Sequence, residues 1–200
     1  MFEIREASCE SGALMIEILV TIAIVVIGLL GVMELQTRLQ VSEMESYQRT
    51  QALMLLDDMS NRIAINRPDA SNYTTDETVG VGAHTSNCGS TTTGNLDIKD
   101  EAEWCLALKG AAEKSGTSNV GALIAGRGCV ESVGTGGIEE YLVTVAWQGL
   151  SPVAQPPVSI KCGKNLYDLP TGSSCAIKPD FCRRYVATIV RIADLSDTSP

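Results

Sequence analysis

The first long pattern along the chain is an apolar run near its N-terminus. Residues 13–33 are 21 residues, and Glu17 is the only charged one among them. About 20 apolar residues at ~1.5 Å per residue match the thickness of the hydrocarbon core of a bilayer. The run therefore predicts a transmembrane helix in contact with membrane lipid.

The helical pattern continues beyond the apolar run, because no Gly or Pro occurs between Met33 and Pro68. Apolar residues at helical spacing form one stripe, made of Val41, Met44, Ala52, Leu55, Met59 and Ile63. The residue before a proline disfavours the α conformation, so the helix should end near Arg67. We expect one helix over residues 13–66, with its second half packed on a globular domain. A coiled-coil anchor is the alternative, but no sustained heptad of large apolar residues supports it.

Residues 67–137 are rich in small polar side chains and predict loops with one short helix. Acidic residues at Asp97, Asp100 and Glu101 suit the first turn of that helix, which we place at about residues 97–112. Two glycine-rich segments, at residues 126–128 and 134–137, are also assigned to loops. Neither has the Lys-Ser/Thr pair of a phosphate-binding loop.

The last third alternates between apolar and polar positions, as strands do. Three strands are predicted, at residues 141–147, 158–162 and 185–193. Since no long helix separates them, they favour an antiparallel meander within residues 138–200. The predicted fold class is α+β, with a long N-terminal helix packed on a small antiparallel sheet.

Charge and candidate chemistry exclude several functions. The 200 residues carry a net charge of −9, and the nearest approach to a basic cluster is Arg183-Arg184, so no direct nucleic-acid binding is expected. The single histidine, His84, has no nucleophile or acid at a recognisable spacing. The acidic group at residues 97–101 lacks EF-hand spacing, and the cysteines lack the C-x-x-C spacing of zinc sites. We expect no catalytic residue, metal or cofactor; an enzyme or small-molecule receptor on a membrane anchor is a distant alternative.

The start of the apolar run carries the most specific motif, Gly12-Ala13-Leu14-Met15-Ile16-Glu17. A secretory signal peptide does not fit, because the start is acidic, the run is too long and no small-residue cleavage site follows it. The motif resembles the type IV prepilin signature, whose usual form is G-F-T-L-I-E. This resemblance implies that a prepilin peptidase removes residues 1–12 by cleaving between Gly12 and Ala13. It also implies N-methylation of the new amine on Ala13.

Glu17 is the functional residue that the apolar run singles out, because a carboxylate inside a membrane helix is costly. The resemblance implies that Glu17 pairs with the N-terminal amine of a neighbouring subunit in a filament. The alternative is a side chain that only snorkels to the headgroups.

Within this superfamily the chain is most similar to PilV-type minor pilins. The similarity is carried by residues 102–108, 126–130, 141–149 and 183–193. It implies a pilin fold and a subunit that is incorporated into a type IV pilus or primes its assembly, in support of twitching, adhesion or DNA uptake. The implied partners are the prepilin peptidase, other major and minor pilins and the inner-membrane assembly platform. A minor pseudopilin of a type II secretion system is the close alternative.

The cysteines fit the location that the resemblance implies: a single pass through the inner membrane, a periplasmic C-terminal domain, and then the filament at the cell surface. Cys9 lies in the leader, whose removal leaves 21 acidic and 14 basic residues, a net charge of −7. The six cysteines that remain are an even number, which in an exported domain indicates disulfides. Proximity along the chain favours one of the 15 possible pairings, Cys88–Cys105, Cys129–Cys162 and Cys175–Cys182.

Overall fold

The computed structural model of the chain describes most of its residues: 11–83, 87–111, 114–116, 118–119, 121, 123–135, 138–168 and 172–193. The chain divides into two units, Met1–Met44 and Glu45–Pro200. Helix α1, Ser11–Ile65, supplies the described part of the first unit and the first element of the second. The predicted long helix over residues 13–66 is confirmed to within two residues at each end.

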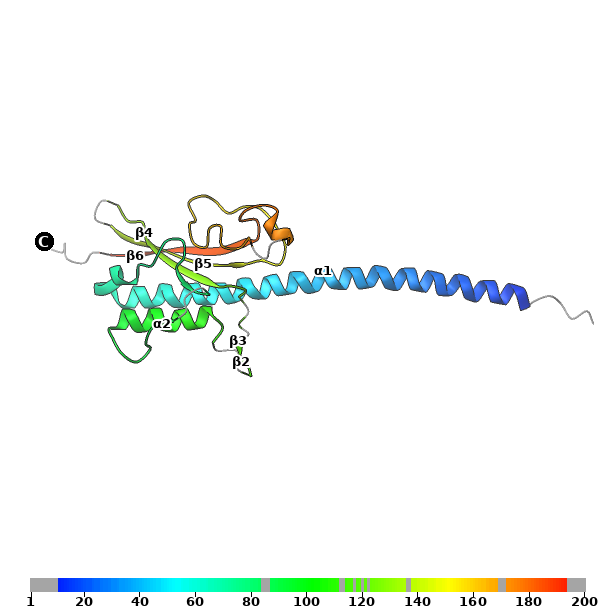
Figure 1. Cartoon of the computed structure of the whole chain (residues 1–200), viewed down its shortest axis with the longest axis horizontal. Coiled ribbons are helices and arrows are strands. Elements are labelled where there is room, and N and C mark those ends of the chain that lie inside the picture. Colours follow the sequence, from blue (N-terminus) through cyan, green and yellow to red (C-terminus); the bar gives the residue numbers. More distant parts are fainter. Residues whose placement is uncertain are drawn as a thin grey trace, which may run out of the picture. The chain divides into compact units, whose positions relative to one another are not determined.

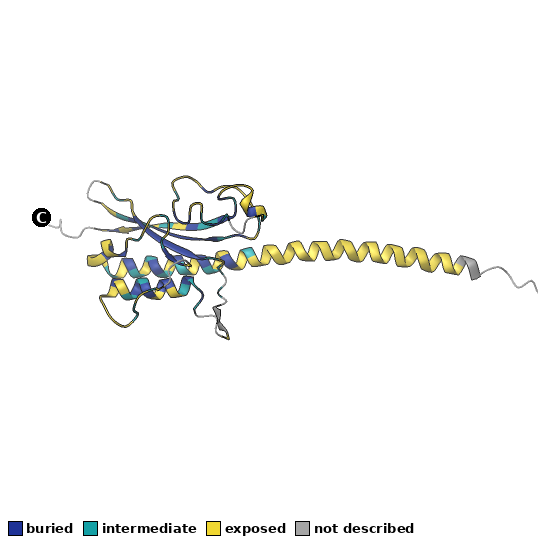
Figure 2. Cartoon of the chain, in the orientation of Figure 1, coloured by how far each residue is buried: buried dark blue, intermediate teal, exposed yellow. Residues whose placement is uncertain are grey.

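The described part of the first unit is a helix with an exposed apolar surface. Every side chain from Leu14 to Met44 is exposed, as Figure 2 shows along α1. This is the one helix among the described residues that is long and apolar enough to cross a membrane, with a mean hydropathy of 2.7 in its most apolar window. Length and composition therefore allow a membrane span here.

The second unit is built around an antiparallel sheet of four strands in the order β1-β4-β5-β6. Its strands are β1 Val81–Gly82, β4 Arg127–Ser132, β5 Glu139–Gln148 and β6 Arg183–Ile192. Three of these strands, β4, β5 and β6, are labelled in Figure 1. A separate pair, β2 Lys114–Ser115 and β3 Ser118–Asn119, forms a small hairpin. Helix α2, Leu96–Leu108, and two 3-10 helices, Arg67–Tyr73 and Ser174–Ala176, complete the described elements.

The main core of this unit lies between one face of the sheet and the two helices. Alternate residues of β5 point into it, and Val143 and Val145 are fully buried. Helix α1 contributes four buried residues, Ala52, Leu56, Met59 and Ile63. Three of them belong to the predicted stripe, while Leu56 and the buried Gln48 were missed.

A second buried cluster lies on the opposite face of the sheet. It contains Cys129, Ala146, Cys162 and Tyr167, each 0% exposed. Cys162 and Tyr167 belong to the long connection between β5 and β6, so this connection covers part of the face that the helices leave open.

The structure corrects three of the predicted elements. Residues 127–132 form strand β4, although the glycines there predicted a loop. Residues 158–162 are not a strand: backbone bonds from Ile160 to Pro157 and from Lys164 to Lys161 fold them into turns. Helix α2 ends at Leu108, before residue 112, because Gly110 adopts a positive φ of 69° that ends the helix.

Candidate functional site

The residues of the prepilin-like motif lie at the start of α1. Gly12 and Ala13 fall in the helix, whereas residues 1–10 lie outside the described part of the chain. Glu17 is exposed, and no described residue forms a hydrogen bond or ion pair with it. This end of α1 offers an apolar surface with a single carboxylate, and its cleavage, methylation and pairing stay predictions.

The second half of α1 is joined to α2 by a buried tryptophan. The side chain of Trp104 is 0% exposed, and its indole Nε1–H donates to the carbonyl of Leu55 at 2.9 Å. The other side of the ring lies against Gly128 of β4, where a Cβ atom would overlap the indole. Trp104 therefore contacts the helix and the sheet at once.

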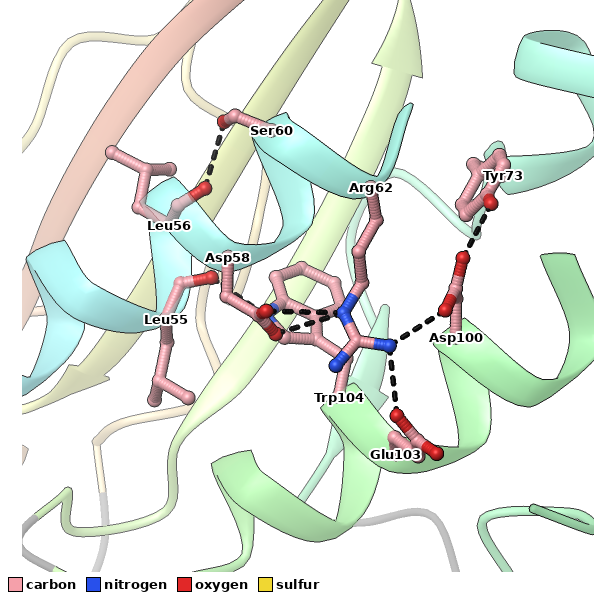
Figure 3. A network of polar contacts seen from close by, with 9 residues as sticks. All are labelled: Leu55, Leu56, Asp58, Ser60, Arg62, Tyr73, Asp100, Glu103 and Trp104. Atoms are coloured by element: carbon pink, nitrogen blue, oxygen red, sulfur yellow. Dashed lines mark hydrogen bonds and ion pairs between the residues drawn. The ribbon is translucent and has the colours of Figure 1, made fainter. Parts of the chain in front are cut away.

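Arg62 is the centre of a polar network beside this tryptophan (Figure 3). Its Nη1 donates to Asp100 at 2.6 Å and to Glu103 at 2.8 Å, and its Nε donates to Asp58 at 3.0 Å. Burial lowers the pKa of Arg62, but the bonds to Glu103, Asp58 and Asp100 outweigh it and hold the pKa above its ordinary value. The guanidinium therefore stays charged and links α1 to α2.

Tyr73 extends the network to the 3-10 helix that follows α1. Its hydroxyl donates to Asp100 at 2.6 Å and accepts a bond from Asn66 at 3.2 Å. Burial, followed by the bond to Asp100, raises the pKa of Tyr73 to about 12. We call this group the α1–α2 anchor, made of Leu55, Arg62, Tyr73, Asp100 and Trp104.

Sequence reasoning missed most of the anchor. Only the Asp58–Arg62 pair has the i,i+4 spacing that marks a contact on one helix. Asp100 follows Arg62 by 38 residues, and Asp97 and Asp100 were interpreted as charges that suit the first turn of α2. Asp97 does lie in that turn, whereas Asp100 faces Arg62 and Tyr73.

The three predicted disulfides are confirmed. Cys88–Cys105, Cys129–Cys162 and Cys175–Cys182 close separations of 17, 33 and 7 residues. In the second disulfide Cys129 belongs to strand β4, and Cys162 lies in a turn and not in the strand predicted at residues 158–162. This bond therefore ties the sheet to the connection that covers it.

Buried ionic contacts hold the same connection. Arg183 and Asp180 form an ion pair at 3.0 Å, with side chains 1% and 0% exposed. Arg183 also donates to the carbonyls of Ile160 and Cys162 at 2.8 and 2.9 Å. A charge pair this deeply buried requires such additional bonds, so these contacts specify the path of the connection.

Arg127 is a second buried cation on this face. Its Nη1 donates to the carbonyl of Val79 at 3.0 Å, and its guanidinium carbon lies 5.9 Å from the ring centre of Tyr167. Burial lowers the pKa of Arg127 and raises that of Tyr167. Both side chains are held by backbone carbonyls, since the hydroxyl of Tyr167 donates to the carbonyl of Ala125 at 3.1 Å as Arg127 does to that of Val79.

The described residues hold no group of three or more His, Cys, Asp or Glu side chains that could bind a metal. His84 lies outside the described residues. Comparison of the chain with protein-family models, with curated proteins and with solved structures finds no match.

Proposed function

We propose that this chain is a minor pilin, a subunit incorporated into a type IV pilus or needed to prime its assembly. One observation carries the proposal: Glu17 is the only charge in an apolar helical segment that begins directly after Gly12 and exposes its side chains from Leu14 onward. Such a surface requires a non-aqueous partner, which is lipid before assembly and the helices of other subunits afterwards.

Glu17 gives that surface its specificity. Cleavage after Gly12 creates a positively charged amine on Ala13. In a filament, the amine of a neighbouring subunit is the cation that can pair with Glu17. Pairing the two charges removes the cost of leaving a carboxylate among apolar helices. Glu17 thereby fixes the axial position of the incoming subunit, while the rest of the apolar surface supplies non-directional contact.

The second unit suits a protein that works outside the cytoplasm. The α1–α2 anchor ties α2 to α1, and Cys88–Cys105 ties the loop before α2 to that helix. Cys129–Cys162 ties the long connection to strand β4, and Cys175–Cys182 closes the end of that connection. The proposal places residues 13–33 in the inner membrane and the disulfide-bonded unit in the periplasm. Its partners are the prepilin peptidase, major and minor pilins and the assembly platform.

The test compares two alanine variants of the same helix. Glu17→Ala should leave cleavage and membrane insertion intact, because it makes the apolar run more apolar. It should lower the share of the protein in sheared pili, relative to the membrane fraction, by more than about tenfold, since the neighbour's amine loses its partner. Glu34→Ala is the matched control, because Glu34 follows the apolar run and pairs with Arg38 at 2.6 Å on exposed helix.

Undiminished incorporation of Glu17→Ala would mean that Glu17 only snorkels, and the proposed role would be wrong. If the protein is recovered with the pseudopilins of a type II secretion system and not with pili, the proposed function is wrong and the chain serves that secretion system.

A further inference from the structure

Strand β6 is a long open edge of the four-stranded sheet. It pairs with β5 over ten residues, from Glu139↔Ile192 to Gln148↔Arg183, and no described strand lies on its other side. From Ala187 onward the odd-numbered side chains of β6 are accessible: Ile189 is 50% exposed, Arg191 is 74% exposed, and Ala187 is exposed.

The hydrogen-bond register shows which backbone groups of β6 point away from the sheet. Gln148 donates toward β4, to Ile124 at 2.9 Å, and Gly149 donates toward β6, to Cys182 at 2.7 Å. Odd-numbered residues of β5 therefore bond to even-numbered residues of β6. The odd-numbered residues of β6 direct their N–H and C=O groups outward, and four of them have no partner for these groups among the described residues: Tyr185, Ala187, Ile189 and Arg191.

The opposite edge of the sheet is closed. Strand β1 pairs with Arg127 and Gly128 of β4. Beyond β1, the N–H of Thr75 donates to the carbonyl of Val130 at 3.0 Å, and the N–H of Val130 donates to the hydroxyl of Thr75 at 3.0 Å. Edge strands are usually shortened or covered in this way, because an open edge pairs with other chains. Within the part of the chain that the structure describes, the long β6 edge has no such cover.

An open groove adjoins the start of this edge. It has a volume of about 470 Å³ and is lined by Glu45, Ser46, Arg49, Trp147, Arg184 and Tyr185. Glu45 is already engaged with Arg184 at 3.1 Å. Arg49 is exposed and has no ion-pair or hydrogen-bond partner among the described residues, so the groove carries one unneutralised positive charge.

We propose that the β6 edge binds an extended segment of a different protein chain, added antiparallel to β6, with an acidic side chain near its C-terminal end placed beside Arg49. Antiparallel addition continues the pairing of the whole sheet and brings the C-terminal end of the segment to Tyr185 and the groove. Small or β-branched side chains of the segment lie beside Ala187 and Ile189. The four outward residues of β6 then gain eight backbone hydrogen bonds.

A second copy of this chain fits the edge less well. Head-to-tail addition would need the β1/β4 edge, which is closed. Pairing of β6 with itself about a twofold axis would turn the 45–65 segments of the two copies in opposite directions. Two chains anchored in one membrane face the same way, so pairing of β6 with itself conflicts with the proposed function. Binding of a segment from a different protein does not depend on the proposed function.

Hydrogen exchange of the full chain in micelles tests the proposal. The probe is an acetylated and amidated peptide of alternating Thr and Val that ends in Glu, with a Gln-ended peptide as its pair. The amides of the four outward residues should gain at least tenfold protection with the peptide, while those of Val186, Thr188 and Val190, already bonded to β5, change little. Only strand addition gives this period-two pattern.

Two pairs of variants separate the edge from the groove. Ala187→Pro removes an outward N–H that β5 does not use and should abolish binding, while Ala187→Val keeps the N–H and should bind as the native chain does. Arg49→Gln should weaken the Glu-ended peptide about two- to fivefold and leave the Gln-ended one unchanged. Arg67→Gln, an exposed charge outside the groove, should change neither.

Three results would overturn the proposal. The first is the absence of alternating protection in the native chain at millimolar peptide. The second is an equal loss of affinity for both peptides in Arg49→Gln and in Arg67→Gln, which would show a general charge effect. The third is protection that appears without peptide and rises with protein concentration, because that would show pairing between copies of this chain.

Discussion

The indole N–H of Trp104 donates to the backbone carbonyl of Leu55 at 2.9 Å, which joins residues 49 positions apart in the sequence. Leu55 lies within α1, and Trp104 is one of the largest fully buried side chains of the chain. The bond fixes α1 and α2 against each other at one point along the helix. The indole of Trp104 therefore links α1, α2 and, through its ring, Gly128 of β4.

Replacing this tryptophan tests the bond directly. Trp104→Phe removes the donor and leaves space, so we expect the free energy of unfolding to fall by about 2–4 kcal/mol in a urea titration of the second unit. Trp147→Phe is the matched control, since Trp147 is 3% exposed and its indole has no hydrogen-bond partner among the described residues. Equal losses in the two variants would show that the Leu55 bond adds nothing.

Gly128 should tolerate no side chain. A Cβ atom there overlaps the ring of Trp104, so Gly128→Ala should destabilise the second unit by about 1–3 kcal/mol. Gly31→Ala adds the same methyl group where nothing lies within 4 Å, and it should leave the unfolding of the second unit unchanged. A Gly128→Ala protein of native stability would contradict the contact.

Tyr73 gives the stability of the second unit a dependence on alkaline pH. Its pKa is about 12 in the folded chain and about 10 when unfolded, so its contribution is complete below about pH 10 and is lost as the pH rises toward 12. Between pH 10 and pH 12 the unfolding free energy of Tyr73→Phe should therefore fall by about 2 kcal/mol less than that of the native chain. Tyr47→Phe, at an exposed tyrosine, should retain the native slope.

The disulfides should differ in how much they stabilise the chain. Closing a longer loop removes more entropy from the unfolded chain, which gives about 4 kcal/mol for Cys129–Cys162 and about 2 kcal/mol for Cys175–Cys182, at separations of 33 and 7 residues. Paired Cys→Ser variants, compared by urea titration, should follow this order. Non-reducing peptide mapping checks the three pairs, and a free thiol at any of the six cysteines would contradict them.

The elements that depend on local pattern were predictable from the sequence. The long helix, α2, β5 and β6 carry their periodicity within one segment, and neighbouring cysteines pair as proximity suggests. Strand β4 was not predictable in this way. Gly128 stands in the strand because the ring of Trp104 occupies the space of its side chain, and that reason comes from a residue 24 positions away.

The same limit applies to the α1–α2 anchor and to residues 158–162. Arg62 gains Asp100 and Glu103 as partners only when α2 folds back on α1, so its spacing to these residues carries no local signal. The alternation Val158-Ser159-Ile160-Lys161-Cys162 matches a strand, but its backbone turns so that Cys162 can reach Cys129 on β4. A disulfide and a buried ion pair determine this segment, not its own periodicity.

The mass of the mature N-terminus tests the central claim most directly. The account predicts a chain that begins at Ala13, lacks residues 1–12 and carries one methyl group on the Ala13 amine, in cells that have a prepilin peptidase. The uncleaved precursor should accumulate when the peptidase is absent or when Gly12 is replaced by a bulky residue. An intact Met1 start in cells with an active peptidase, or cleavage beyond residue 30, would contradict the proposal that this chain is a pilin.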